Sequence, residues 1–166
     1  MATPTNLPAA QTTGNVLTAA YVNDLRGAFR ILQVVQATYS AVIVSNSTTT
    51  MVDTNLTATI TPQSSTSKIL VVVHQTMSKS SQADNNAIAA RIVRDSTAIH
   101  TFAVATGYTG TSIANILTVS AMYLDSPATT SATTYKTQIA NFQAAASVAA
   151  NTNNTPGTIT LFEVSA

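Results

Sequence analysis

The sequence predicts an all-β protein: an antiparallel, jelly-roll-like β-sandwich preceded by an extended arm and one short N-terminal α-helix. Three observations lead to this prediction. From Val34 onward, Val, Ile and Thr are abundant, and several segments alternate apolar and polar residues as a strand does. Short polar turn signals separate these segments. No stretch between them is long enough for the helical crossovers of a parallel α/β sheet.

The N-terminal part is expected to be an arm followed by a helix. Residues 1–16 are rich in Pro, Thr and Asn, and Pro4 and Pro8 oppose helix formation. Thr18 is suited to cap the helix that follows. Gly27 weakens that helix, which is too short to be stable without packing. We divide the chain into an attachment and oligomerisation segment, 1–36, and a β-sandwich head, 37–166.

The helix carries an apolar stripe with spacings of three, four and three residues. Such spacing places side chains on one face over two heptads. We expect this face to serve self-association or docking rather than to pack on the protein's own β-domain, which is the alternative. The predicted attachment and oligomer-interface residues are Val22, Leu25, Phe29 and Leu32.

The β-region is predicted to hold eight or nine strands. The segment 56–61 alternates cleanly, whereas 68–73 does not and is expected to be a strand covered on both faces. Residues 94–97 are expected to form a tight hairpin. The expected strands are 34–44, 48–52, 56–61, 68–77, 86–94, 97–104, 113–124, 133–142 and 157–164.

Composition narrows the possible functions. Only 8% of the 166 residues are charged, with 7 Lys+Arg, 6 Asp+Glu and a net charge of +1, so we expect no nucleic-acid partner. Zero Cys removes disulfides, thiolate chemistry and Cys-type zinc sites. No apolar run approaches the roughly 20 residues that a spanning helix needs, so we expect no membrane insertion.

The titratable residues give little sign of catalysis. The two histidines, His74 and His100, are interpreted as ordinary strand residues, His74 partly buried. A catalytic triad depends on spatial geometry, so the proximity of Asp95, Ser96 and His100 in sequence carries no weight. The acids at expected strand ends are interpreted as turn formers: Asp53, Asp84, Asp95 and Asp125. The sequence therefore predicts no enzyme, no metal site and no cofactor.

One aromatic residue is a candidate for ligand binding. Sugar sites combine an aromatic platform with polar neighbours. Most Tyr and Phe residues fall within expected strands and are assigned to the core. Tyr108 lies between Gly107 and Gly110 and is expected at a loop tip, where a contact residue would lie. It is the predicted residue of a possible ligand loop.

Several segments, in order along most of the chain, resemble the fibre and minor virion proteins of tailed bacteriophages. The turn after Asp95 departs from the family's pattern, because Ser96 stands where those proteins usually have Gly. The matching segments are GNVLTAAYVNDL at 14–25, LTATITP at 56–62, SKILV at 67–71, RDSTAI at 94–99, YLDSP at 123–127, TYK at 134–136 and ITLFEV at 159–164.

The resemblance implies a virion structural protein, typically trimeric, with an N-terminal anchor, a β-sandwich head and no catalytic residues. Its expected partners are copies of itself and other virion proteins of the tail, neck or capsid. Two alternatives stay open. One is a glycan-binding adhesin head that attaches to a host surface. The other is a capsid decoration or cement protein.

Overall fold

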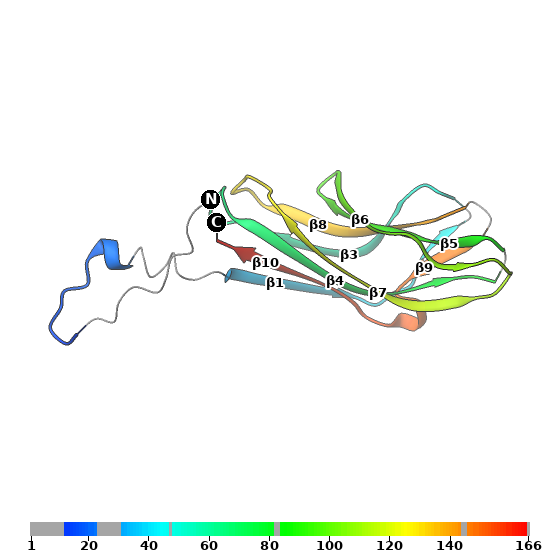
Figure 1. Ribbon diagram of the computed structural model, residues 1–166, viewed down its shortest axis with the longest axis horizontal. Coiled ribbons are helices and arrows are strands. Elements are labelled where there is room, and N and C mark those ends of the chain that lie inside the picture. Colours follow the sequence, from blue (N-terminus) through cyan, green and yellow to red (C-terminus); the bar gives the residue numbers. More distant parts are fainter. Residues whose placement is uncertain (1–11, 23–30, 47, 82–83, 144–145, 166) are drawn as a thin grey trace.

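The computed structural model describes residues 12–22, 31–46, 48–81, 84–143 and 146–165, with backbone only for 44–46. A helical turn at 19–22 precedes ten strands and a short 3-10 helix (Figure 1). The elements are β1 Ile31–Tyr39, β2 Ile43–Asn46, β3 Val52–Ile60, β4 Lys68–Lys79, β5 Asn86–Arg94, β6 Thr97–Thr109, β7 Asn115–Asp125, β8 Thr133–Asn141, β9 Ser147–Ala150, η1 Thr152–Asn154 and β10 Gly157–Val164.

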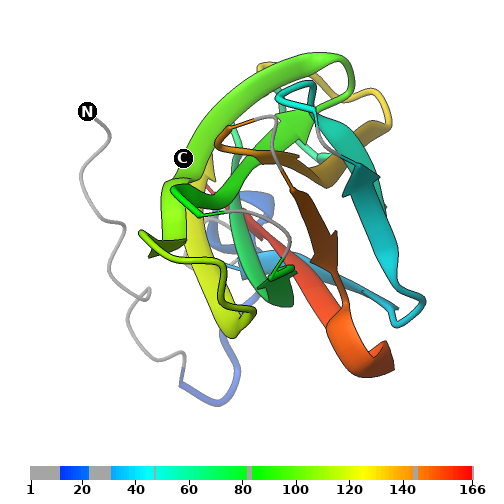
Figure 2. The ribbon, with the colours of Figure 1, turned by 90° about the vertical axis from the view of Figure 1, so that its right-hand side faces the viewer.

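The strands form two antiparallel sheets. Sheet 1 runs β1-β10-β4-β7, with β9 and β2 continuing from the far end of β4. Sheet 2 runs β3-β8-β5-β6. Pairing first with last and interleaving the middle strands in this way is the strand order of a jelly roll. Figure 2 views the sandwich end-on, with the two sheets wrapped around a common interior. The predicted fold class is confirmed.

Several predicted strand boundaries are confirmed and others need correction. The strand at 86–94 and the hairpin at 94–97 are as predicted, since Arg94 pairs with Thr97 across a turn at Asp95, whose φ is 52°. The expected strand 34–44 is two strands, β1 and β2, because the chain bends at residues 40–42. The expected strand 48–52 is mostly a bend that leads into β3. The Ala-rich strand β9 was not predicted.

The interior is filled by the inward faces of both sheets in two apolar clusters. One contains Leu56, Val71, Leu161 and the buried ring of Tyr135, and the other contains Met77, Ile88 and Ile139. Each buried side chain alternates with a more exposed one along β3, β4 and β10. This alternation is what a two-layer sandwich requires.

A buried chain of hydrogen bonds joins the two sheets. Thr137 Oγ1 donates to Gln75 Oε1 at 3.0 Å, and Gln75 Nε2 donates to Asn151 Oδ1 at 2.9 Å. These side chains are fully buried, so each polar group needs a partner. Gly157 lies against them, and a Cβ there would be 2.9 Å from Asn151 Oδ1. Glycine at 157 therefore allows β10 to approach this network.

Candidate assembly surface

The described part of the N-terminal segment confirms the predicted helix start. Thr18 caps it: its Oγ1 accepts from the Tyr21 backbone N–H at 3.1 Å, and its carbonyl accepts from the Val22 N–H at 3.1 Å. Apolar side chains around this turn are exposed, namely Val16, Leu17 and Val22. Val22 is the one predicted attachment residue that the structure describes within the helix.

The rest of the predicted apolar stripe is not a single helical face. Leu25 and Phe29 lie outside the described residues. Leu32 is not helical, because it lies in β1, which begins at Ile31 and also runs across the proposed division at 36/37. Its neighbours Ile31 and Gln33 pair with Val164 and Glu163 of β10. Spacing alone could not distinguish the end of a helix from the start of a strand here.

The outer face of sheet 1 carries a cluster of apolar side chains that we call the sheet 1 patch. The strand register aligns one row across all four strands, Val34–Phe162–Leu70–Leu124. The next row contains Val72 beside Met122, preceded by Gln36 and Thr160. The patch is thus formed by Val34, Leu70, Val72, Met122, Leu124 and Phe162.

Nothing in the described part of the chain covers this patch. Met122 is 69% exposed, Val34 53% and Leu124 48%, while Leu70, Val72 and Phe162 are partly buried beside them. The sequence predicted that 68–73 is covered on both faces. Within the described chain that prediction is wrong, because Ile69, Val71 and Val73 enter the core while Leu70 and Val72 face outward.

The sequence contains features that indicate parts of the sheet 1 patch, although the patch itself was not predicted. Non-alternation at 68–73 marked an apolar outer side of β4. Ile116, Met122 and Leu124 share the outward face of β7 with Thr118 and Ser120, so that face is apolar at both ends. The row itself depends on the register between strands far apart in sequence, which no single segment reveals.

Charged groups are scarce on this outer face. Lys68 and His74, both exposed, flank the patch along β4, so the prediction that His74 is partly buried is wrong. Glu163 points inward from β10 and is fully buried. Burial by itself raises the pKa of Glu163, but hydrogen bonds outweigh it, and the net pKa lies below the ordinary value of 4.5. Its carboxylate accepts from Gln33 Nε2 at 2.6 Å and from the Gln63 N–H at 2.8 Å.

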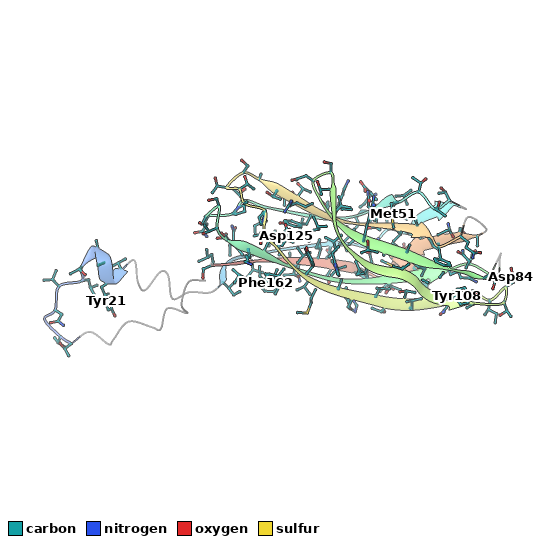
Figure 3. All side chains as sticks on the ribbon, turned by 45° about the horizontal axis from the view of Figure 1, so that its top comes forward. Tyr21, Met51, Asp84, Tyr108, Asp125 and Phe162 are labelled. Atoms are coloured by element: carbon teal, nitrogen blue, oxygen red, sulfur yellow. The ribbon has the colours of Figure 1, made fainter. Side chains whose placement is uncertain are left out.

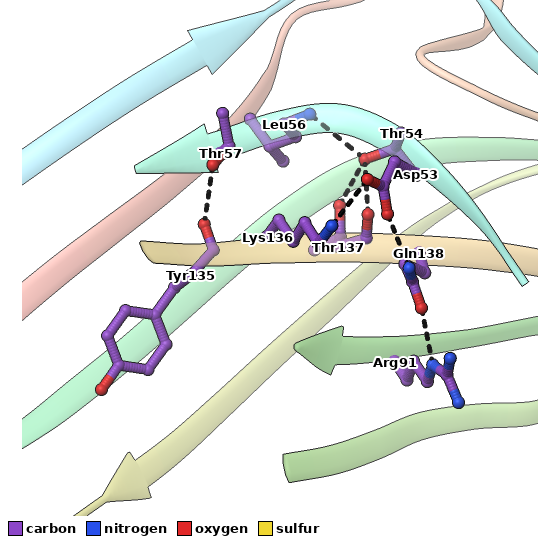
Figure 4. Close-up of polar contacts among 9 residues, drawn as sticks. All are labelled: Asp53, Thr54, Leu56, Thr57, Arg91, Tyr135, Lys136, Thr137 and Gln138. Carbon is purple, nitrogen blue, oxygen red and sulfur yellow. Dashed lines mark hydrogen bonds and ion pairs between the residues drawn. The ribbon is translucent and has the colours of Figure 1, made fainter. Parts of the chain in front are cut away.

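The outer face of sheet 2 has a different character. Asp53 accepts from Lys136 Nζ at 2.7 Å and from Gln138 Nε2 at 2.6 Å, and Gln138 in turn accepts from Arg91 Nε at 2.8 Å (Figure 4). Thr59 continues this polar surface through a hydroxyl pair with Thr134. Exposed large apolar residues on this sheet lie on its edge strand β6, at Val104 and Tyr108.

Tyr108 lies at the opposite end of the sandwich from Phe162 (Figure 3). It belongs to the end of β6 rather than to a loop tip, which corrects its predicted position. Its hydroxyl donates to Asn85 Oδ1 at 2.7 Å, and its ring meets Phe142 edge-on with centroids 6.5 Å apart. Half of the residue is exposed, so one side of the ring faces solvent. A ligand role for Tyr108 stays a prediction.

Asp125 is a buried ion-pair partner and not a turn former. It accepts from Arg94 Nη1 at 2.8 Å and from the Tyr135 hydroxyl at 2.7 Å. Burial and the bond to this carboxylate raise the pKa of the Tyr135 phenol. Because Asp125 lies on β7 while Arg94 and Tyr135 lie on β5 and β8, the group joins the two sheets. Asp125, Arg94 and Tyr135 therefore have a structural role in holding the two sheets together.

The described residues offer little else for chemistry. Among them no group of three or more His, Asp or Glu side chains is placed to hold a metal ion. The same part of the chain contains no detected pocket. None of its helices is long and apolar enough to cross a membrane. Exposed apolar surface is therefore the main feature from which a function can be inferred.

No family model matches the chain, and no curated protein matches it. Similar solved structures include the VP2 subviral particle of infectious bursal disease virus, at 18% identity and a TM-score of 0.40, covering 81% of this chain and 38% of that one. Others are the Gx strain of that virus (15%, 0.44, 81% and 37%) and T=1 particles derived from it (15%, 0.43, 81% and 36%).

The chain spans less than two-fifths of the length of these neighbours. Identities of 15–18% and TM-scores of 0.40–0.44 are too low to transfer a family or a role. The jelly-roll assignment rests on the strand order of the chain itself.

Proposed function

We propose that this protein is a structural component of a bacteriophage virion, without enzymatic activity: a small trimeric fibre-type protein held on the particle by its N-terminal segment. One observation carries the proposal. The described chain exposes neutral apolar surface, on the arm at Val16, Leu17 and Val22 and on the sheet 1 patch, and offers no metal cluster or pocket. Such surfaces serve protein–protein contacts.

The segments that resemble phage fibre and minor virion proteins support this assignment. They include the N-terminal segment 14–25, which contains the capped turn, and the last strand at 159–164. A surface poor in charge also suits a protein that lives among copies of itself, because it lacks the charge repulsion that keeps free proteins apart. The N-terminal segment would anchor the protein, and the sandwich would project or pack against neighbouring heads.

Attachment is tested by replacing Val22→Asp and Leu25→Asp together in the full chain. We expect purified particles to lose the protein and light scattering to show smaller assemblies, because two carboxylates cannot be buried unpaired in an apolar contact. The matched control is Thr57→Asp with Thr59→Asp on the outer face of sheet 2. Unchanged incorporation and scattering in the Val22/Leu25 variant would contradict the proposed anchor.

The second candidate function is host-glycan binding by an adhesin head. The observation favouring it is the half-exposed ring of Tyr108, with Phe142 and Asn85 beside it. Under this alternative, Tyr108→Ala abolishes adsorption of particles to cells and leaves assembly intact. A glycan array that shows no binding by the multivalent protein would count against it.

The position on the particle is a separate question, since a tail fibre, a neck or head fibre and a capsid decoration protein all fit the same surfaces. Electron microscopy of particles carrying a gold-labelled copy distinguishes them. A ring at the neck or a signal at the tail supports the fibre-type assignment. A lattice over the whole capsid supports the decoration alternative.

A further inference from the structure

We infer that the sheet 1 patch is the surface on which a second copy of this chain packs, so that neighbouring heads meet through the outer face of sheet 1. The inference deepens the proposed function and rests on it for the number of copies, three. Its occupant is another molecule of the same chain rather than a glycan or a different virion protein. Register, charge and the edge of the sheet support it independently.

The register gives the patch an extent that side-chain composition alone does not show. The row Val34–Phe162–Leu70–Leu124 crosses the sheet from one edge to the other. The patch fills one row of four positions and half of the next row, and these six positions, on strands about 4.8 Å apart and in rows about 6.6 Å apart, cover roughly 190 Å². That is about a quarter of one side of a standard protein interface, so the patch would form the apolar centre of a contact with a polar rim.

The charges point to a neutral partner. Along the described parts of β1, β10, β4 and β7, the outward residues include Lys68 and His74 but no carboxylate, since Glu163 and Asp125 are buried. No acid–base pattern is present that would select a charged partner. The chain as a whole has a net charge of only +1, so copies repel one another weakly. A second apolar sheet face is the natural cover, because sheets pack on each other face to face.

The edge strand of sheet 1 beside the patch, β7, also has an edge that could contact another protein. β7 pairs with β4 in unbroken register from Asn115 to Asp125, and its other edge has no strand partner in the described chain. It contains no Lys, Arg or Pro, the residues that usually protect an edge from pairing. By contrast, register shifts interrupt the pairing of the edge strands β1, β3 and β6. The regular, unprotected edge lies where Met122 and Leu124 are exposed.

The three copies of the proposed function require a head-to-tail contact, and the two halves of the patch can supply its two sides. One half has Val34 and Phe162 on β1 and β10, and the other has Met122 and Leu124 on β7. When the first half of one copy packs on the second half of the next, each copy uses both halves, and three copies close a ring. Each contact then uses only part of the patch, so the assembly should dissociate on dilution.

The test uses the full chain in analytical ultracentrifugation over a range of concentrations. Wild type is expected to give the mass of three chains, and Met122→Lys with Leu124→Lys is expected to give monomers, with a dissociation constant raised about 100-fold or more. Thr57→Lys with Thr59→Lys, on sheet 2, is the matched control and keeps the trimer. Circular dichroism and thermal unfolding establish that each variant is folded.

The outcomes separate the inference from the proposed function. A monomeric wild type, or a folded patch variant of unchanged mass, overturns the inference. A patch-dependent dimer keeps the interface and overturns the trimer. Absence of the wild-type protein from particles overturns the virion assignment alone, whatever the mass in solution.

A mixing experiment tests the head-to-tail geometry. Val34→Lys damages one half of the patch and Met122→Lys the other, so each variant alone is expected to be monomeric. In an equimolar mixture, the intact Val34 half of the Met122→Lys variant can pack on the intact Met122 half of the Val34→Lys variant. The mixture is therefore expected to form a species of two chains. A mixture that stays monomeric would overturn the head-to-tail arrangement.

Discussion

The two outer faces of the sandwich are built from the same strand geometry but carry opposite chemistry. On sheet 2, outward side chains such as Asp53, Lys136 and Gln138 bind one another and face water. On sheet 1, the equivalent positions of β4 and β10 hold Leu70, Val72 and Phe162. Alternation dictates only which residues turn outward. The chemistry of those residues then determines whether a face remains solvated or is covered by a partner.

The largest expected effect concerns what holds the sheets together. Asp125→Ala leaves the buried Tyr135 hydroxyl unpaired and removes the partner of Arg94, so unfolding should become easier by about 3 kcal/mol. Asp53→Ala on the outer face of sheet 2 removes an exposed pair and should change it by less than about 1 kcal/mol. Urea denaturation of both variants measures this difference. Equal losses would mean that the sheet 2 network is structural and not simply solvated surface.

The next prediction makes the two faces alike. Leu70→Thr with Phe162→Thr introduces β-branched residues, which suit strands, but removes apolar surface from the main row. We expect association of copies to weaken about tenfold to 100-fold, with little change in the stability of the monomer. Sedimentation equilibrium measures the association of copies, and thermal unfolding measures the stability of the monomer. A variant that associates as well as wild type would show that the row is not the contact.

Lowering the pH is expected to have a smaller effect on the free energy of unfolding. Hydrogen bonds hold the pKa of Glu163 below its ordinary value of 4.5, although burial acts in the opposite direction. A lowered pKa in the folded state stabilises the protein above the unfolded pKa, and this stability is lost as pH falls through the folded value. The free energy of unfolding should therefore fall below about pH 4.5, and Glu163→Gln should flatten that fall. Denaturation curves between pH 6 and 3 measure it, and an unchanged slope would contradict the assignment.

The smallest effect is expected at the far end of the sandwich. Tyr108→Ala removes one hydrogen bond and one edge-on ring contact at a half-exposed position, so it should change unfolding by about 1 kcal/mol. It should leave the mass of the assembly unchanged, because the ring lies away from the sheet 1 patch. Ultracentrifugation of this variant checks that claim. Loss of assembly in this variant would mean that copies contact one another near Tyr108 and not through the sheet 1 patch.

Local patterns were enough to predict much of the fold. Clean alternation at 56–61 predicted the second half of β3, and the turn at Asp95 predicted the β5–β6 hairpin. Leu32 was misassigned because apolar spacings of three and four also occur where a helix pattern meets a strand. The Ala-rich strand β9 lacks β-branched enrichment apart from Val148, which explains its omission.

The candidate surface was harder to predict than the fold, because it is assembled across strands. Met122 and Val34 lie far apart in sequence, and only the register of β1, β10, β4 and β7 brings them to one face. The same holds for Asp125, whose partners lie on other strands. A single segment can indicate that its outer side is apolar, as 68–73 did, but it cannot indicate the row to which it belongs.

Alkylation of introduced thiols measures directly which face of the sandwich becomes inaccessible on assembly. The chain contains no Cys, so a single introduced thiol reports one position. Met122→Cys and Thr59→Cys are each alkylated at concentrations where copies are associated and where they are separated. Association should slow alkylation about tenfold or more at position 122 and leave the rate at position 59 unchanged. Equal rates at position 122 in both conditions would contradict packing through the sheet 1 patch.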